Sequence, residues 1–440
     1  MPERLAFRLK GWNLEQGTRP VQGSQAFTIA WIAAAYFLAA TASMSIFRPD
    51  SEIICLWFAN VIVVACLIRH PSFALTPSGI AIFAAALAAN LVCGNPLDVA
   101  LMFAGANLFG VVAGAGLVRW RGSWPADREQ GVKDYAETLV LSGAIAPAVT
   151  ALIVATAAHL LFAWPFGTTA WSWLAGDALS FAMLLPIFLL VSRRRIGQAF
   201  GSGGVLRLAA WIAICCGTAV LSTTAVNVPF IVAMVPLMLA AASNRPFEVA
   251  IITAVTGLGF VGAAMAGIVP SLEGSITFAN GYQIAVAITI VFPFLGSLLI
   301  ERVQHERRRI AESEQRFRRA MEDSAIGVAI VGLDGCIVEA NKAFADLLGY
   351  ERDELKGVAF ATISHPDDTT VGADVVRTVL DGRSRTYTFE KRYMRKDGQA
   401  VWTRITGSVI TDVETGAPLY LVSQIENLSL IHISEPTRPY

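Results

Sequence analysis

Long apolar runs fill the first 300 residues of the chain and are rare after that point. Most of them approach the about 20 residues that a membrane-spanning helix needs, although the second, third and eighth are short. The ten runs cover approximately residues 26–47, 53–68, 77–93, 97–118, 136–163, 171–191, 206–223, 228–242, 247–269 and 281–300. The pattern predicts a polytopic α-helical membrane bundle of ten spans, with eight spans as the alternative if two short runs are re-entrant.

The stretch after the last apolar run is strongly charged but keeps a helical pattern. Its apolar residues follow the three-and-four spacing of a helix that can pair with its own copy: Ile300, Val303, Ile310, Phe317 and Met321. Arg307 and Glu314 fill the intervening positions of this seam, so pairing through it would be weak by itself. We interpret residues 301–324 as a signalling helix; the alternative is a charged helix that only connects two domains.

From about residue 313 onward the pattern is that of a small α+β domain. Short apolar runs and turn residues predict five strands near residues 326–331, 336–340, 385–394, 401–411 and 419–425. Asn341 is expected to cap a helix that ends at Gly349, and a second helix should run from about Thr369 to Leu380. The order predicts a five-stranded antiparallel sheet with short helices over residues 313–429.

Composition supports a membrane protein and weakens other classes. Hydrophobic residues make up 55% of the chain and charged residues 15%, both outside the range of ordinary soluble domains. The net charge is zero, which gives no support to a nucleic-acid partner. The six cysteines show no metal-binding or disulfide spacing, and five of them lie inside apolar runs: Cys55, Cys66, Cys93, Cys215, Cys216 and Cys336.

The placement of Lys and Arg predicts an orientation. Basic residues gather on alternate connections between the runs, near residues 4–19, 69, 119–133, 193–207 and 245, and again after residue 300. On the opposite side Arg48 is the single exception. By the positive-inside rule, the polar N-terminal arm (residues 1–25) and the C-terminal domain are expected in the cytoplasm, and the first apolar run is expected to be an uncleaved anchor.

Polar residues inside the apolar runs are costly there and indicate function. The candidates are Asn60, Asn90, Asn107, His159 and Asp177. In the predicted topology His159 and Asp177 lie just below the outer ends of the fifth and sixth spans, where they could pair. We therefore expect an outward-facing polar pocket for a small-molecule stimulus, with Asp177 as its strongest candidate and a rim formed by Trp57, Trp164, Trp171 and Trp173. In the alternative, each Asn bonds a neighbouring helix and the tryptophans are interfacial anchors.

Three segments resemble a known sensor family. LWFANVIVVACLIRHP (residues 56–71), NLFGVVAGAGLVRW (107–120) and WSWLAGDALSFAMLLPIFLLV (171–191) are similar to the membrane-associated sensor domain of the MASE type 1 family, and the resemblance covers residues 26–300. It implies a bacterial inner-membrane sensory domain, usually of eight spans, that is coupled to cyclic-di-GMP enzymes or to histidine kinases. Its stimulus would be an unidentified small molecule.

The C-terminal part resembles a PAS domain. The resemblance rests on residues 313–357, the His-Pro-Asp-Asp turn at His365, and residues 389–412. It implies a hollow between sheet and helices that holds a ligand or a partner. A flavin photoreceptor would need a reactive cysteine on the central helices, where the sequence has none, and His365 belongs to a turn motif common in such domains. We therefore expect neither haem nor flavin, and a role in relay and dimerisation.

The end of the chain sets the functional prediction. Residues 430–440 (LIHISEPTRPY) resemble translated sequencing-adapter read-through, so an output domain is expected to be missing. The sequence has no GGDEF-like, EAL-like, phosphate-loop, phospho-histidine or metal-cluster motif. The chain is predicted to be a receptor fragment without its own catalysis, whose intact form regulates cyclic-di-GMP turnover as a diguanylate cyclase or phosphodiesterase. The alternatives are the sensor part of a histidine kinase and a transporter with a regulatory PAS tail.

Overall fold

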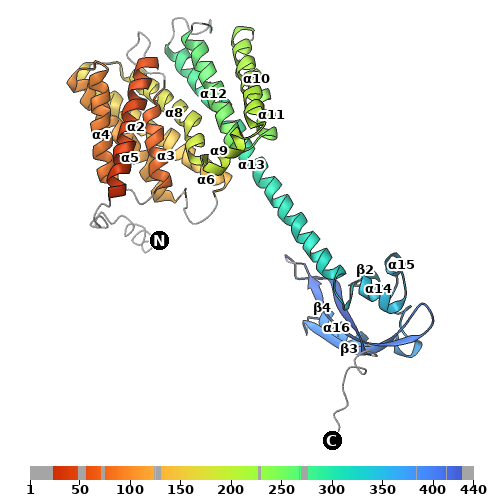
Figure 1. Ribbon diagram of the computed structural model, residues 1–440. Coiled ribbons are helices and arrows are strands. Elements are labelled where there is room, and N and C mark those ends of the chain that lie inside the picture. The colour runs from red at the N-terminus through yellow and green to blue at the C-terminus, as the bar shows by residue number, and fades with distance from the viewer. Residues whose placement is uncertain are drawn as a thin grey trace. The chain divides into compact units, whose positions relative to one another are not determined.

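The computed structural model divides the chain into two compact units, Met1–His305 and Glu306–Tyr440 (Figure 1). It describes residues 23–47, 56–70, 75–122, 124, 130–225, 229–266, 268, 276–382, 384–412 and 414–428. Most of the predicted N-terminal arm, Arg48, Cys55 and the whole predicted tail at 430–440 lie outside these residues.

The first unit, here called the helical unit, consists of helices in its described part. They are α2 (Gly23–Phe47), α3 (Phe58–Arg69), α4 (Leu75–Val92), α5 (Leu97–Arg121), α6 (Val132–Val140), the π-helix η1 (Leu141–Ile145), α7 (Ala146–Phe162), α8 (Phe166–Leu190), α9 (Arg193–Phe200), α10 (Gly204–Ala225), α11 (Pro229–Ser243), α12 (Pro246–Met265) and the start of α13 (Ile276–Glu322). Each of the ten apolar runs coincides with a helix, as predicted. The short α9 was not predicted; its N-cap, Ser192, accepts a hydrogen bond from the Arg195 amide (3.2 Å).

Helix length separates the ten runs into two groups. Among the described residues, seven helices are long and apolar enough to cross a membrane. The shorter apolar helices are Phe58–Arg69, Pro77–Val92 and Phe230–Ser243, the three runs that the sequence marks as short. The fifth run is one rod from Val132 to Phe162 in which a π-turn precedes Pro147, a residue that lacks the amide hydrogen needed for regular α-helical bonding.

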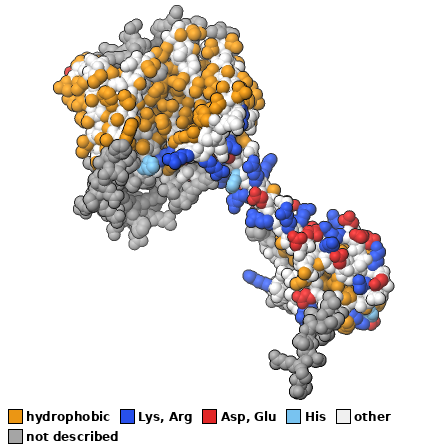
Figure 2. Space-filling model, in the orientation of Figure 1, with side chains coloured by type: hydrophobic (Ala, Val, Ile, Leu, Met, Phe, Trp, Pro, Cys, Tyr) orange, Lys and Arg blue, Asp and Glu red, His pale blue; other side chains and the backbone are white. Residues whose placement is uncertain are grey.

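The outer surface of the helical unit is apolar. Side chains such as Val92, Leu160 and Leu206 are 71%, 76% and 78% exposed, and Figure 2 shows hydrophobic side chains covering the visible face of this unit. Exposed apolar surface of this extent is unfavourable in water and suits a hydrocarbon environment. The unit thus has the surface of a membrane protein.

Arginines bond the C-terminal ends of two neighbouring helices, α3 and α8. Arg69 donates to the Phe188 and Val191 carbonyls at the end of α8 (2.7 and 2.9 Å). Arg119 of α5 donates to the Leu67 and His70 carbonyls at the end of α3 (both 3.2 Å). These bonds satisfy carbonyl groups that have no partner inside their own helix. The basic residues therefore stabilise the bundle at the end where α3, α5 and α8 finish.

The second unit, here called the sheet unit, contains the predicted five-stranded antiparallel sheet, and its strand order is β2-β1-β5-β4-β3. Its elements are β1 (Gly327–Gly332), β2 (Ile337–Ala340), α14 (Lys342–Leu348), α15 (Arg352–Leu355), the 3-10 helix η3 (Pro366–Asp368), α16 (Ala373–Leu380), β3 (Thr386–Met394), β4 (Ala400–Thr411) and β5 (Pro418–Asn427). The predicted helix start at Thr369 is wrong: Gly372 has φ +89°, a left-handed backbone that delays α16 to Ala373.

Helix α13 contains nearly all of the predicted signalling helix. It runs for 47 residues from Ile276 to Glu322 with Pro293 inside it. Three of the predicted seam residues are exposed: Val303 by 44%, Ile310 by 65% and Phe317 by 58%. Met321 differs, since it is only 8% exposed and packs within the sheet unit. The exposed apolar stripe is therefore shorter than the predicted one.

Candidate functional site

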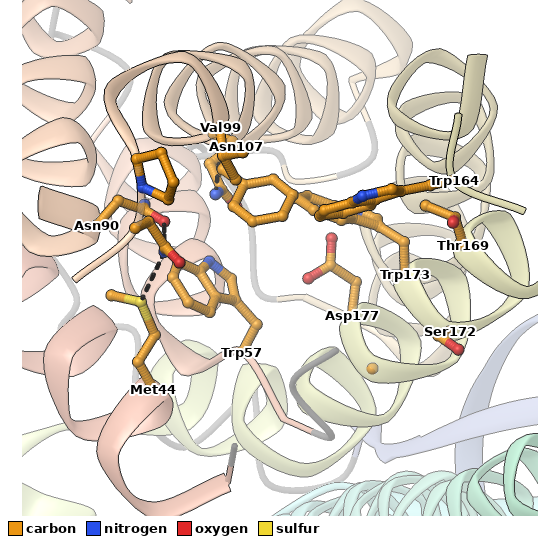
Figure 3. Close-up of a pocket in the computed structure, with 14 residues that line it drawn as sticks. Met44, Trp57, Asn90, Val99, Asn107, Trp164, Thr169, Ser172, Trp173 and Asp177 are labelled. Atoms are coloured by element: carbon orange, nitrogen blue, oxygen red, sulfur yellow. Dashed lines mark hydrogen bonds between the residues drawn. The ribbon is translucent and has the colours of Figure 1, made fainter. Parts of the chain in front are cut away.

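A pocket of about 230 Å³ opens at one end of the helical unit (Figure 3). It lies where α3, α5 and α8 begin and where α2 and α4 end, opposite the ends that the arginines close. Its lining is Met44, Trp57, Asn90, Asn95, Pro96, Val99, Phe103, Asn107, Trp164, Thr169, Ser172, Trp173, Gly176 and Asp177. Three of the predicted polar residues are among them (Asn90, Asn107 and Asp177), together with three of the four predicted rim residues (Trp57, Trp164 and Trp173).

Asp177 is the charged residue of this pocket. It is 4% exposed, and within the described part of the chain no Lys or Arg forms an ion pair with it. The polar groups that face its carboxyl are the Asn60 amide and the Trp173 indole. Figure 3 shows the carboxyl directed into the pocket, with Trp57 on one side and Trp164 and Trp173 on the other. A buried carboxyl without a cation is energetically costly, so its position calls for an explanation beyond packing.

Aromatic side chains form the walls around this carboxyl. The Phe103 ring lies 5.5 Å from that of Trp173 and 6.1 Å from that of Trp164, measured between centroids. Trp57 is positioned by its backbone amide, which donates to the Ser180 hydroxyl (2.8 Å). The indole nitrogens of Trp57 and Trp173 are buried and have no hydrogen-bond partner among the described residues. The pocket thus combines one carboxyl with several aromatic surfaces.

A chain of buried hydrogen bonds lies behind the pocket. The Tyr36 hydroxyl donates to Asn60 Oδ1 (3.2 Å), and Asn60 Nδ2 donates to Asn107 Oδ1 (2.9 Å). Asn107 Nδ2 in turn donates to the Phe103 carbonyl one helical turn away (2.8 Å). These bonds join α2, α3 and α5, which agrees with the alternative interpretation of the asparagines as links between helices. Asn60 belongs to this chain and does not line the pocket.

Asn90 has a similar double role. Its Nδ2 donates to the Ala86 carbonyl (2.9 Å), and its Oδ1 accepts from Asn95 Nδ2 (2.7 Å). Asn95 follows the left-handed Gly94 (φ +87°) in the α4–α5 connection. The pair therefore fixes the loop that borders the pocket.

Besides Asn60, two other predicted pocket residues do not line the pocket. His159 is exposed and does not pair with Asp177; its Nδ1 hydrogen-bonds the Trp164 carbonyl (2.9 Å), which requires the proton on Nδ1. Trp171 is 40% exposed and does not line the pocket. It lies two residues before Trp173 on α8, so their side chains point about 200° apart around the helix.

Trp164 reaches the pocket through an unusual backbone at Ala163. This residue ends α7 with φ +58°, in the left-handed region that disfavours side chains. The turn directs the chain back so that the Trp164 amide bonds the Ala158 carbonyl (3.3 Å). Such strain is often retained where geometry serves function.

The prediction missed several lining residues. Thr169, Ser172 and Gly176 were missed on α8, where they share one face with the predicted Trp173 and Asp177. Phe103 lies one turn before Asn107 on α5. A helical projection centred on Asp177 in α8 and on Asn107 in α5 would have identified these lining residues. Met44 and Asn95 had no such local signal.

A second site joins the end of α13 to the core of the sheet unit. Asn341 is 1% exposed, and its Nδ2 donates to the carbonyls of Met321 and Ile326 (both 2.9 Å). Its Oδ1 accepts from the amides of Val328 (2.8 Å) and Phe344 (3.0 Å). Glu322, the last residue of α13, forms an ion pair with Arg352 (2.6 Å). Asn341, predicted only as a helix cap, therefore ties α13, β1 and α14 together.

The His-Pro-Asp-Asp turn is held against β3. Arg392 Nε and its backbone amide donate to Asp368 Oδ2 (2.8 and 2.9 Å), and its Nη2 donates to Oδ1 (2.8 Å). These hydrogen bonds from Arg392 hold the pKa of Asp368 far below its usual range. His365 occupies the N-cap of η3, where its Nδ1 accepts from the Asp367 amide (3.3 Å). His365 thus has the turn position that the sequence predicts.

A lysine lies in the interior of the sheet unit. Lys391 is 6% exposed; its Nζ donates to the Ser364 hydroxyl (2.8 Å) and lies 4.6 Å from the centre of the Tyr393 ring. Burial lowers the pKa of Lys391 to about 8. The side chain is therefore close to neutralisation at moderately alkaline pH.

Comparison with known proteins agrees with the fold of the second unit. Residues 337–424 match the family model of the PAS fold. These residues form a PAS domain. The chain is 39% identical over 130 residues to the probable diguanylate cyclase DgcE of Escherichia coli, covering 30% of this chain and 12% of that protein.

Two further relatives are sensors by name. The sensor histidine kinase TmoS of Ectopseudomonas mendocina is 24% identical over 110 residues, covering 25% of this chain and 11% of that protein. The C4-dicarboxylate transport sensor protein DctS of Rhodobacter capsulatus is 31% identical over 134 residues, covering 29% and 20%. This chain thus matches only a small part, at most a fifth, of the length of each of these relatives.

Solved structures similar to this chain include PAS domains. One, from Colwellia psychrerythraea, has 20% identity and a TM-score of 0.25, and it covers 26% of this chain and 97% of its own. Another is the N-terminal domain of a diguanylate cyclase with a PAS/PAC sensor from Marinobacter aquaeolei, with 24% identity, a TM-score of 0.22, and coverage of 24% and 98%.

Proposed function

We propose that this chain is the sensor part of a bacterial inner-membrane receptor. Its helical unit, of the MASE type 1 kind, receives a small-molecule stimulus in the Asp177 pocket, and its PAS domain relays the response. The observation that carries the proposal is α13, a single helix from Ile276 to Glu322 whose first part is apolar and whose last turn bonds the PAS core through Asn341. A rigid helix of this kind transmits rotation or displacement between domains.

Contacts inside the helical unit support a route from the pocket to α13. Trp164 follows the rod formed by α6, η1 and α7, and the other end of that rod carries Tyr135. The Tyr135 ring packs edge-on against Phe294 of α13, with 6.0 Å between centroids. A stimulus that moves Trp164 would shift the rod and with it α13.

The proposed orientation places the pocket outside the cell and the PAS domain in the cytoplasm. Its support is charge: Arg69, Arg119, Arg195 and Arg207 lie at the ends of the helices away from the pocket. The intact receptor would carry an output domain. Similarity to a probable diguanylate cyclase supports cyclic-di-GMP turnover as the output, and similarity to a sensor histidine kinase supports a kinase as the second candidate.

Changing the helical phase of α13 tests the coupling. Residues 1–428 are joined in frame to the catalytic part of the DgcE relative, and cyclic-di-GMP is measured in cells that lack other cyclases. Two residues inserted after Arg308 rotate the following helix by about 200°, and seven residues restore its phase within about 20°. We expect the two-residue insertion to change the output strongly and the seven-residue insertion to preserve it. Equal outputs from both insertions would contradict the proposal.

We also propose that the receptor is a homodimer paired through the exposed stripe of α13. Val303, Ile310 and Phe317 recur every seven residues, the repeat of a coiled-coil seam. Ile310→Cys should form an intermolecular disulfide in membranes, in a background in which Cys336 is replaced by Ser. Arg308→Cys, on another face, is the matched control. Equal cross-linking at both positions would argue against a defined seam.

The PAS domain is proposed to act without haem or flavin. His365 is occupied as the cap of η3, which supports a structural role for it. An absorption spectrum of the purified full chain tests this directly. A Soret or flavin band that follows the protein through purification would overturn the proposal.

A transporter with a regulatory PAS tail is the remaining alternative. Accumulation of a substrate in vesicles that contain the protein would favour it.

A further inference from the structure

The Asp177 pocket has the chemistry of a cation site. Asp177 is only 4% exposed, and its carboxyl has no cationic partner among the described residues. The surrounding walls are the rings of Trp57, Phe103 and Trp173. Aromatic faces carry negative electrostatic potential and attract cations. The carboxyl and the aromatic walls therefore both favour a positively charged ligand and disfavour an anion.

The lining selects an organic cation over a metal ion. Hard metal ions take several oxygen ligands. Here Asn107 Oδ1 already accepts from Asn60, and Asn90 Oδ1 accepts from Asn95. Aromatic rings instead suit an ammonium group that carries carbon substituents. The volume of about 230 Å³ is below the about 300–1,000 Å³ of common ligand pockets, so the ligand is compact.

We propose that this pocket binds a small organic ammonium compound, with the ammonium group between the Asp177 carboxylate and the tryptophan rings. This inference deepens the proposed sensor function by naming the class of its stimulus. The ammonium group can belong to a free amine or to the headgroup of a lipid, since both present the same chemistry. The positive charge of the ligand would then compensate the buried carboxylate of Asp177.

Calorimetric titration of the full chain in dodecyl maltoside tests the proposal. The probes are choline, ethanolamine and tetramethylammonium chlorides, with sodium chloride as the ionic-strength control. The uncharged 3,3-dimethyl-1-butanol has nearly the shape of choline and isolates the effect of charge. We expect saturable binding of at least one ammonium probe, and choline binding about tenfold or more tighter than its uncharged analogue.

Variants locate the binding. Asp177→Asn should weaken ammonium binding about tenfold or more, because it removes the charged partner. Asp98→Asn is the matched control, since Asp98 is exposed near the pocket but does not line it. Trp173→Leu should also weaken binding, whereas Trp173→Phe retains an aromatic face and part of the affinity. A melting curve for each variant verifies folding.

Three results would overturn the proposal: no ammonium probe binds the folded wild-type protein, the uncharged analogue binds as tightly as choline, or folded Asp177→Asn retains full affinity. The source of the ligand is resolved in nanodiscs. A lipid headgroup in the pocket would make phosphatidylethanolamine nanodiscs weaken ethanolamine binding relative to phosphatidylglycerol nanodiscs, and a free amine would bind both equally. Because these titrations require no output domain, their failure is distinct from a failure of the α13 insertion experiment.

Discussion

In the sheet unit the buried side chains of Asn341 and Lys391 have hydrogen-bond partners, whereas at the pocket end of the helical unit two buried indole nitrogens have none among the described residues. Asn341 makes four hydrogen bonds, and Lys391 bonds Ser364. In the pocket, Asp177 has no cation, and the indole nitrogens of Trp57 and Trp173 have no hydrogen-bond partner among the described residues. The first set stabilises the fold through hydrogen bonds, and the second agrees with the ligand site that we propose.

The surfaces of the two units also differ in polarity. Figure 2 shows hydrophobic side chains over the helical unit and charged side chains of both signs over the sheet unit. The former suits lipid and the latter suits water. Removing polar groups in each unit and measuring whether stability falls or rises tests this difference.

The largest expected effect is at the junction of α13 with the PAS core. Asn341→Ala removes four buried hydrogen bonds and should destabilise a fragment of residues 306–428 by about 3 kcal/mol. Urea unfolding followed by circular dichroism measures the change. The exposed Gln399→Ala is the control and should have little effect. A loss below about 1 kcal/mol would show that Asn341 does not hold the junction.

Lys391 gives the sheet unit a distinctive pH dependence. Its folded pKa, about 8, lies below that of an unfolded lysine, about 10.4, so between these values the unfolded chain holds a proton that the folded chain has lost. Stability should therefore rise from pH 8 to 10.4, by about 2–3 kcal/mol, and should not change from this group below pH 8. Urea unfolding at pH 7.5 and 10 measures the rise. Lys391→Met should abolish it, and an unchanged rise in that variant would exclude Lys391 as its source.

The same substitution should have opposite effects at two carboxyls. Asp177→Asn removes an uncompensated buried charge and should stabilise the ligand-free helical unit by about 1–2 kcal/mol, read as a higher melting temperature in detergent. A lower melting temperature would show that the charge has a structural partner.

Asp368→Asn is the counterpart in the sheet unit. It breaks a close ion pair with Arg392 and should destabilise the fragment at neutral pH. Since the folded pKa of Asp368 is depressed, its contribution is present above about pH 4 and decreases as pH falls below that value. Acid unfolding curves of wild type and variant should therefore converge at low pH, and curves that stay parallel would contradict this role.

The smallest expected effect concerns the turn that places Trp164. Ala163→Gly relieves a left-handed backbone and should stabilise the helical unit by about 0.5–1 kcal/mol. The matched Ala151→Gly, inside α7, should instead destabilise it by about 1 kcal/mol. Melting in detergent compares the two. Equal losses would show that the turn is not strained.

Local patterns in the sequence were enough to predict the long helices and the five strands, and to single out Asp177 as a candidate site residue. Helix and strand periods are local properties, and a carboxyl in an apolar run is conspicuous without any structure. The five strands and the helix cap at Asn341 follow from turn and cap residues that act within a few positions.

Which side chains meet depends on the packing between elements, which the sequence pattern does not give. The rotation of each helix about its axis depends on distant neighbours, so it turned Trp171 and His159 away from the pocket and brought Phe103 into it. Asn341 caps α14 as predicted, and it also binds the end of α13. The second role was not predicted, because the Met321 carbonyl that Asn341 binds is 20 residues earlier in the chain. Spacing along the chain defines a face, and packing between elements chooses what that face contacts.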